Sequence, residues 1–167
     1  MIQPTEAAPY YFRYINLVPP ENILGTLQSQ LDDSISLFRT ISEEKSLYRY
    51  SADKWSIRQV LNHISDTERV FLHRAFWFAR GFEVPLASFD QDDCALAAEA
   101  DEVPWANLTE EFQSVRLASI SFFKNLNPAS WNRSGIASDN KFTVRALAHI
   151  IAGHLSHHRA VLEEKYL

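Results

Sequence analysis

Apolar residues recur at steps of three and four along four stretches of the chain, which is the spacing of one buried helix face. The first stretch follows Pro19-Pro20 and ends at about Ser42, with an apolar face made of Leu24, Leu27, Leu31, Ile35 and Phe38. The second runs from Ile57 to about Arg80, and its apolar face carries Ile57, Val60, Ile64, Phe71, Ala75 and Phe78, interrupted by Thr67 and Glu68. Both patterns predict full helices.

The ends of the second predicted helix are marked by residues with capping roles. Ser56 is a favoured N-cap residue, and Gln59 three positions later completes a capping box. Gly81 follows the last apolar position and predicts the end of the helix, because glycine readily adopts the left-handed conformation found there.

A long segment separates the second predicted helix from the third. Residues 82–106 carry two prolines, an acidic cluster and one short helical pattern, CALAAEA. The third helix begins at Asn107 or Thr109 and ends near Leu126, with one side formed by Phe112, Val115, Ser119, Phe122 and Leu126. Antiparallel neighbours in a bundle are joined by about 2–8 residues. A connection this long therefore predicts a crossover between parallel second and third helices.

A fourth helix is predicted at the C-terminal end of the chain. An irregular link over residues 127–142 precedes it, and Thr143 caps it. It runs to about Lys165, with a buried face made of Leu147, Ile151, His154, His158 and Val161. Together the four patterns predict an all-α four-helix bundle that forms a single domain over residues 1–167.

Composition narrows the classes of partner. The net charge is −5 and no Lys/Arg cluster occurs, which argues against nucleic acid as a partner. No run approaches the roughly 18 apolar residues of a membrane span, and the first residues lack a secretory pattern, so we expect a cytoplasmic protein. Cys94 is the only cysteine; it excludes an internal disulfide, and we expect it to be a small buried hydrophobe.

Two histidines on the fourth helix suggest a metal site. His154 and His158 are four residues apart, so they lie one turn apart on the same, apolar face. Imidazoles in a core are costly unless their nitrogens find partners, and one zinc-like ion satisfies both. Taken alone the pair is a weak signal, because such pairs also occur on exposed faces or in cores with ordinary hydrogen bonds.

A third ligand would make the site specific, and His63 is the best choice. It lies at the margin of the buried face of the second helix, within about two turns of its start. His73 is too far along the same helix to share an ion with it. His149 and His157 point away from the His154–His158 face and are expected to be solvated or hydrogen-bonded.

Other motifs that would assign a chemistry are missing from the sequence. HLSHH has no Glu after its first His, so it lacks the general base of the His-Glu-x-x-His zinc proteases. The paired Glu-x-x-His motifs of di-iron bundles are also missing. No glycine-rich loop is present that could hold a nucleotide phosphate.

The segment KWSIRQVLNHISDTERVFLHRAFWFARG, followed later by FTVRALAHIIAGHLSHHRAVL, resembles the DinB/YfiT-like metalloenzymes of the DinB superfamily. In that family a Trp-Ser start precedes a helix that carries one ligand histidine in an H-x-x-D-x-E run, and a His-x-x-x-His on the last helix completes the site. Here the run is His63, Asp66 and Glu68, and the pair is His154 and His158. The matching segments cover about fifty residues, Lys54–Gly81 and Phe142–Leu162.

The resemblance implies a four-helix bundle with up-down-down-up connectivity and a frequent homodimer. It also implies a divalent metal ion, zinc or nickel, held by His63, His154 and His158. Members of the family with assigned activities include thiol-dependent S-transferases and a thiol-dependent isomerase. The resemblance therefore implies a small-molecule substrate and a low-molecular-weight thiol as a further cofactor.

Two roles for the site stay open at this point. Three histidine ligands leave at least one coordination position free, which favours a metal-dependent enzyme of the thiol S-transferase or hydrolase type. The alternative is a non-catalytic metal-binding bundle that acts as a dimeric interaction module through the aromatics Phe76, Trp77 and Phe78. No catalytic residue is identified. Asp66 and Glu68 either orient imidazoles or are solvated charges, and Arg145 and Arg159 either hold an anionic substrate or are solvated.

Overall fold

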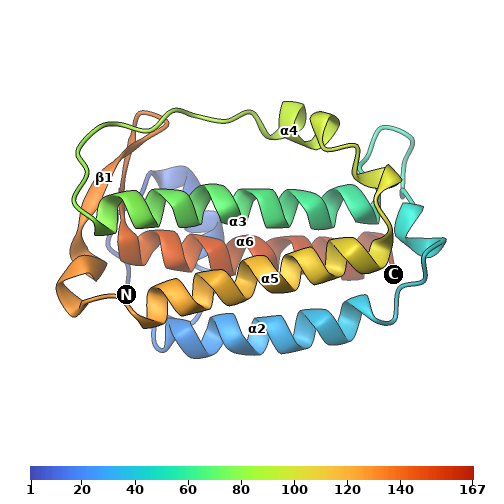
Figure 1. The fold of residues 1–167 in the computed structure, drawn as a ribbon, viewed down its shortest axis with the longest axis horizontal. Coiled ribbons are helices and arrows are strands. Elements are labelled where there is room, and N and C mark those ends of the chain that lie inside the picture. The colour runs from blue at the N-terminus through green and yellow to red at the C-terminus, as the bar shows by residue number, and fades with distance from the viewer.

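The computed structural model describes all residues, 1–167, and four long helices dominate it (Figure 1). These are α2 (Ile23–Phe38), α3 (Ile57–Ala79), α5 (Trp105–Lys124) and α6 (Val144–Lys165). Helices α5 and α6 each pack against both α2 and α3. The predicted four-helix bundle agrees with this arrangement. None of these helices combines the length and apolar character that a membrane span requires.

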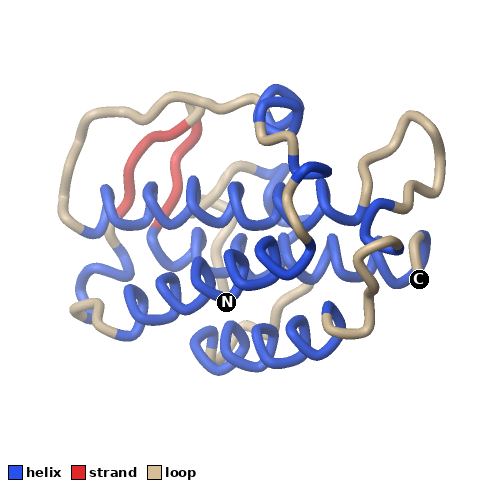
Figure 2. The backbone as a smooth tube through the Cα atoms, turned by 45° about the vertical axis from the view of Figure 1, so that its right-hand side comes forward, coloured by secondary structure: helices blue, strands red, loops and turns tan.

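Short elements precede the first long helix and connect the long helices (Figure 2). They comprise four 3-10 helices, two short α-helices and two strands: η1 (Pro9–Tyr11), α1 (Phe12–Ile15), η2 (Lys45–Leu47), α4 (Gln91–Ala97), η3 (Ala100–Glu102), η4 (Pro128–Asn132), β1 (Ser134–Ala137) and β2 (Asn140–Thr143). The small sheet is the one departure from an all-α fold.

The capping residues place α3 and α6 where the sequence predicts them. Ser56 accepts a hydrogen bond from the Gln59 amide, and the Gln59 side chain accepts one from the Ser56 amide, which completes the capping box of α3. Gly81 follows α3 with a φ of 82°, the left-handed conformation expected after a helix. Thr143 accepts a hydrogen bond from the Ala146 amide and caps α6.

Trp105 explains why two helix ends differ from their predicted positions. Helix α2 ends at Phe38 rather than near Ser42, and the Trp105 indole donates to the Phe38 carbonyl at 3.1 Å. Helix α5 begins at Trp105 itself, earlier than Asn107, because the Glu43 carboxylate accepts a hydrogen bond from the Trp105 amide at 3.0 Å. Both contacts join residues distant in the sequence, so local pattern did not reveal them.

The predicted irregular link over residues 127–142 is wrong in its second half. Strands β1 and β2 pair antiparallel, with Ala137 opposite Asn140, and form a hairpin at one end of the bundle (Figure 2). The turn residues Ser138 and Asp139 have φ values of 50° and 59°. This two-residue turn contains no glycine, and its sequence therefore lacks the usual hairpin signal.

The segment between α3 and α5 runs back along the length of the bundle and carries α4 on its way (Figure 1). This course agrees with the predicted crossover. The expectation that Cys94 is buried is wrong: the thiol side chain is exposed. Helix α4 turns only Ala95 into the protein, and Leu96 is 77% exposed, so a seven-residue surface helix has no second buried position for the cysteine.

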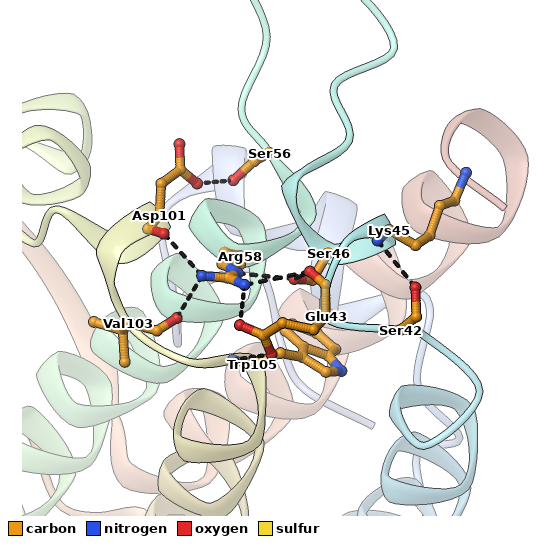
Figure 3. Close-up of polar contacts among 9 residues, drawn as sticks. All are labelled: Ser42, Glu43, Lys45, Ser46, Ser56, Arg58, Asp101, Val103 and Trp105. Atoms are coloured by element: carbon orange, nitrogen blue, oxygen red, sulfur yellow. Dashed lines mark hydrogen bonds and ion pairs between the residues drawn. The ribbon is translucent and has the colours of Figure 1, made fainter.

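A buried arginine of α3 holds two connections, the one between α2 and α3 and the one between α3 and α5, at one end of the bundle (Figure 3). Arg58, 4% exposed, donates to the Ser46 hydroxyl at 2.8 Å and pairs with the Glu43 carboxylate. It also donates to the carbonyls of Asp101 and Val103 at 2.8 and 2.9 Å. Every polar group that Arg58 brings into the interior thus has a partner, as buried charge requires.

The N-terminal segment is held against α6 by an acidic residue. Glu6 is buried, pairs with Arg145 and accepts a hydrogen bond from the Thr143 hydroxyl at 2.9 Å. The Thr143 amide also donates to the Glu6 carbonyl at 2.9 Å. Helix α1 packs on α6 beyond this anchor. Residues before the first long helix therefore form part of the folded structure around α6.

Glu6→Gln is expected to lower the free energy of unfolding at pH 7 by about 1–2 kcal/mol. The hydrogen bonds from Arg145 lower the pKa of the Glu6 carboxyl to about 2. Because the folded-state pKa is depressed, this contribution is present above about pH 4.5 and is lost as the pH falls through about 2. Urea titrations between pH 7 and 2 should show the parent and the variant converging, whereas a Glu21→Gln variant, changed at an exposed position, should follow the parent.

Candidate metal centre

The three predicted ligand histidines come from the two helices that pack together at the centre of the bundle. His63 lies on α3, and His154 and His158 lie one turn apart on α6. His63 and His154 are each 5% exposed, and His158 is half-buried. The level of His63 relative to the pair could not be deduced from spacing. In the structure one ring nitrogen from each of the three lies within 4.8 Å of the others.

The three imidazoles converge through the same ring atom. The His154 Nε2 lies 3.1 Å from the His63 Nε2 and 3.1 Å from the His158 Nε2. A neutral imidazole carries one ring proton, so one Nε2 cannot form good hydrogen bonds to two such neighbours. Zinc–nitrogen bonds of about 2.0–2.1 Å in tetrahedral geometry place ligand nitrogens about 3.3 Å apart. The observed spacing is close to that value, so these residues fit a bound ion.

Burial keeps all three rings neutral. It lowers the pKa of His63 to about 4 and is the largest cause that lowers the pKa of His158 to about 3. Burial, followed by the charge of His158, also lowers the pKa of His154 well below its usual value. Metal ligands must be deprotonated, and these rings already are at neutral pH. The donor set is thus prepared to take a cation.

Groups around the rings fix their orientation. The Thr67 hydroxyl lies 3.4 Å from the His63 Nδ1, the nitrogen that does not face the other histidines. The Trp55 ring packs on His63 with centroids 4.9 Å apart, and the Tyr14 ring meets His154 edge-on at 5.3 Å. In the sequence Thr67 stood out only as a polar interruption of an apolar face. Its position one turn after His63 on the same helix is the feature from which this contact could have been predicted.

Neither acidic residue predicted beside His63 hydrogen-bonds to a ligand ring. Asp66 accepts from Asn62 at 2.8 Å and from Arg69 at 2.9 Å on the outer side of α3. Glu68 is buried, and it accepts two hydrogen bonds from Arg116. The proposed orienting role is therefore not seen in these contacts, and the solvated alternative is wrong for Glu68.

Glu68 belongs to a buried polar network that joins all four long helices. Arg116, fully buried on α5, donates to the Glu68 carboxylate at 2.8 Å and to the Gln30 side-chain oxygen of α2 at 3.1 Å. Gln30 in turn donates to the Ala152 carbonyl at 3.0 Å and the Ser156 hydroxyl at 2.8 Å, both on α6. These α6 residues lie on either side of His154. The network thereby fixes α6 relative to α3, the two helices that carry the histidines.

The remaining histidines and the two named arginines have other partners. His73 and His157 are exposed, as expected. His149 is buried, and its Nδ1 lies 2.9 Å from the Arg145 carbonyl, in agreement with the hydrogen-bonded alternative. Arg145 pairs with Glu6 of the N-terminal segment, and Arg159 donates to the Glu163 carboxylate, one turn later on α6, at 3.1 Å.

Gly153 brings the N-terminal segment against the site. A Cβ at this position would lie 2.1 Å from the Tyr14 carbonyl oxygen, which is backbone and cannot move alone. Tyr14 in turn contacts His154, the next residue after the glycine. The absence of a side chain at position 153 thus allows α1 to approach the histidines closely.

Gly153→Ala is expected to destabilise the fold by about 1–3 kcal/mol, because the added methyl group overlaps the Tyr14 backbone. The sign is the informative part, since an unobstructed Gly→Ala change within a helix stabilises by about 1 kcal/mol. Denaturant unfolding measures the change, and a more stable variant would contradict the close packing of α1 on α6.

Two pockets border the three histidines on different sides. One, of about 270 Å³, is lined by Tyr10, Tyr11, Tyr14, His63, Thr67, Phe71, Phe89, Gln91 and His154; it is called the tyrosine pocket below. The other, of about 240 Å³, is lined by Tyr50, Asp53, Lys54, Trp55, Val60, His157, His158, Val161 and Tyr166. A small molecule can therefore approach the histidines from more than one direction.

The fold and the histidine cluster agree with a family assignment made on the sequence as a whole. The family model of the DinB superfamily matches residues 26–162, and the chain belongs to that superfamily. A search of curated proteins found no match.

Two solved structures share the fold. YfiT from Bacillus subtilis, described as a probable metal-dependent hydrolase with an unusual four-helix bundle topology, aligns with a TM-score of 0.71 and 14% identity over 98% of this chain and 90% of YfiT. A mycothiol-dependent maleylpyruvate isomerase aligns with a TM-score of 0.73 and 9% identity over 87% of this chain. The alignment covers 61% of the isomerase. At these identities the likeness is one of fold.

Proposed function

We propose that the protein is a metal-dependent enzyme in which His63, His154 and His158 bind one divalent ion, zinc or nickel. The observation that carries the proposal is the convergence of three neutral imidazoles: the His154 Nε2 lies 3.1 Å from the Nε2 atoms of both His63 and His158, and His63 and His154 are buried. An ion held by three protein nitrogens supplies Lewis-acid chemistry at its free position and makes a thiol or a water molecule nucleophilic near neutral pH.

The reaction we favour is transfer of a small thiol to an electrophile, with hydrolysis as the alternative for the same site. A transfer needs space for two reactants next to one centre, and the pockets on two sides of the histidines supply that space. In such a reaction the thiol gives its proton to water, its sulfur forms the new bond to carbon, and the leaving group departs with its electron pair. Membership of the DinB superfamily supports this choice.

The further features of the proposal concern the protein as a whole. Residues 1–167 form one DinB-like domain, and the four helices have up-down-down-up connectivity, which the return of the chain between α3 and α5 supports (Figure 1). A homodimer, a cytoplasmic location, and a small-molecule substrate rather than a nucleic acid or membrane partner stay predictions. A non-catalytic metal-binding module remains the alternative function. Phe78 lies in the core and cannot belong to the interaction surface of that module.

Thiol transfer can be tested with 2-mercaptoethanol and 1-chloro-2,4-dinitrobenzene, a pair whose product is coloured. We expect the zinc- or nickel-loaded protein to accelerate the reaction, and chelation to return the rate to that of the buffer. The hydrolytic alternative is followed with 4-nitrophenyl acetate under the same conditions.

The matched controls are a His63→Ala, His154→Ala, His158→Ala triple variant and a His73→Ala variant, changed at an exposed histidine of α3. The triple variant should be inactive, and the His73→Ala variant should have the same reaction rate as the parent. Equal rates for the parent and the triple variant would contradict catalysis at this centre and favour the interaction module.

A further inference from the structure

The tyrosine pocket has an unusual lining for a site next to a metal centre. Five of its nine lining residues are aromatic rings of tyrosine or phenylalanine, and two more are the imidazoles of His63 and His154. The lining includes no Lys, Arg, Asp or Glu. Its polar groups are hydroxyls and one amide, from the tyrosines, Thr67 and Gln91.

The rings form a continuous path from solvent to the histidines. Tyr10 is 52% exposed at the rim, and it meets Tyr14 edge-on with centroids 6.2 Å apart. Tyr14 is 9% exposed and meets His154 at 5.3 Å. On the other wall, Tyr11 packs edge-on against Phe71 at 5.9 Å. Exposed faces and edges of such rings can make the same edge-to-face or offset-stacked contacts with the ring of a ligand.

Two arginines lie close to these walls, and each contacts an aromatic ring from outside the pocket. Arg13 lies over the Tyr10 ring, 4.0 Å from its centroid. Arg74 lies 5.5 Å from the Phe71 centroid and donates to the Ser138 hydroxyl at 2.8 Å. Neither residue lines the pocket. In the metal-free protein, a charged ligand group placed inside would therefore lose water without gaining a counter-charge, which costs several kcal/mol.

We propose that the tyrosine pocket binds an uncharged, single-ring aromatic molecule, and that the tyrosines of residues 10–14 and Phe89 select it. The inference rests on the proposed function, in which this molecule is the electrophile presented to the metal-activated nucleophile. A volume of about 270 Å³ lies just below the range of about 300–1,000 Å³ for pockets of drug-sized ligands, which suits one substituted ring. The selecting tyrosines precede residues 26–162, the range matched by the family model, whereas Phe89 lies within it.

The test compares two probes that differ by one charge. Nitrobenzene and 4-nitrobenzoate are titrated into the protein, both metal-free and zinc-loaded, and amide NMR shifts report affinity and location. We expect nitrobenzene to bind the metal-free protein at least about tenfold more tightly than 4-nitrobenzoate, a difference of about 1.4 kcal/mol. The shifted signals should come from residues 10–14, Phe71 and Phe89.

Variants at the rim keep the test independent of folding. Tyr10→Ala, at a half-exposed position, and Phe89→Ala, in the crossover segment, should each weaken nitrobenzene binding several-fold. Tyr48→Ala removes a tyrosine that is 43% exposed and does not line the pocket, and it should bind as the parent does. Unchanged affinity in both rim variants would overturn the assignment, as would equal or tighter binding of 4-nitrobenzoate to the metal-free protein.

The two proposals fail separately in this experiment. Metal content measured on the same samples reports on the proposed function alone. Selective binding of nitrobenzene by a chain that takes up no metal would remove the catalytic role and leave the pocket assignment in place. A metal-loaded chain without selectivity for the uncharged probe would remove only the inference.

Discussion

Arg116→Met is expected to lower the free energy of unfolding by about 3–5 kcal/mol, because it leaves a buried carboxylate without its counter-charge. Arg116 is fully buried and donates to Glu68 through both Nε and a terminal nitrogen, at 3.1 and 2.8 Å. Glu68 is 3% exposed, both of these hydrogen bonds end on its Oε2, and its Oε1 has no hydrogen-bond partner. Urea unfolding of the metal-free protein measures the loss.

Two further variants separate charge burial from loss of packing. The double variant Glu68→Leu, Arg116→Met removes both charges and should recover most of the lost stability, since replacing a whole buried pair by apolar residues is often neutral. Arg69→Met removes another arginine that joins α3 to α5, through Glu111, but at a side chain that is 44% exposed. It should cost less than about 1 kcal/mol. A small effect of Arg116→Met, or a double variant as unstable as the single one, would contradict this account.

Metal binding is expected to produce the second large effect. An ion that binds only the folded protein stabilises it by about 2.7 kcal/mol at a free concentration of one hundred times Kd, and by about 4.1 kcal/mol at one thousand times. Chelation should therefore lower the melting temperature of the parent. The same treatment should leave the His63→Ala, His154→Ala, His158→Ala variant unchanged, because that chain has no histidine cluster to release a metal from.

The metal-free protein should also lose stability in mild acid. Burial lowers the pKa of His63 to about 4 in the folded state, whereas the unfolded chain titrates near 6.5. Between these values the unfolded state binds more protons, so the free energy of unfolding falls as the pH is lowered from about 6.5 towards 4. His63 alone accounts for about 3 kcal/mol over this range. His158, with its pKa lowered to about 3, extends the loss to lower pH.

A His63→Leu variant provides the control for this acid sensitivity. It removes one of the groups that titrate and should show a shallower dependence of unfolding free energy on pH over the same range. Parallel pH profiles for the parent and the variant would show that His63 is not a source of the slope.

Local sequence signals were sufficient for the helices that carry the histidines. The capping box at Ser56 and the cap at Thr143 fixed the starts of α3 and α6 within the sequence itself. Periodicity then placed His63 and His154 on buried faces, where both lie. Helical spacing was also enough to bring His158 beside His154, because one turn of α6 joins them.

Contacts between distant residues account for what the sequence did not reveal. The start of α5 depends on the Glu43 carboxylate, and the end of α2 on the Trp105 indole. From the sequence, Glu68 was interpreted as an orienting or solvated charge. Its partner, Arg116, lies on another helix, and no local motif links the two residues. The tyrosine pocket likewise depends on α1 packing against α6 at Gly153, a contact that periodicity cannot predict.

The most direct measurement is elemental analysis of the purified, tag-free protein beside the His63→Ala, His154→Ala, His158→Ala variant and the His73→Ala control. We predict about one zinc or nickel ion per chain in the parent and in His73→Ala, and none in a triple variant that circular dichroism shows to be folded. A parent without metal, even after reconstitution, or a triple variant that retains the ion, would contradict a metal centre at these three histidines.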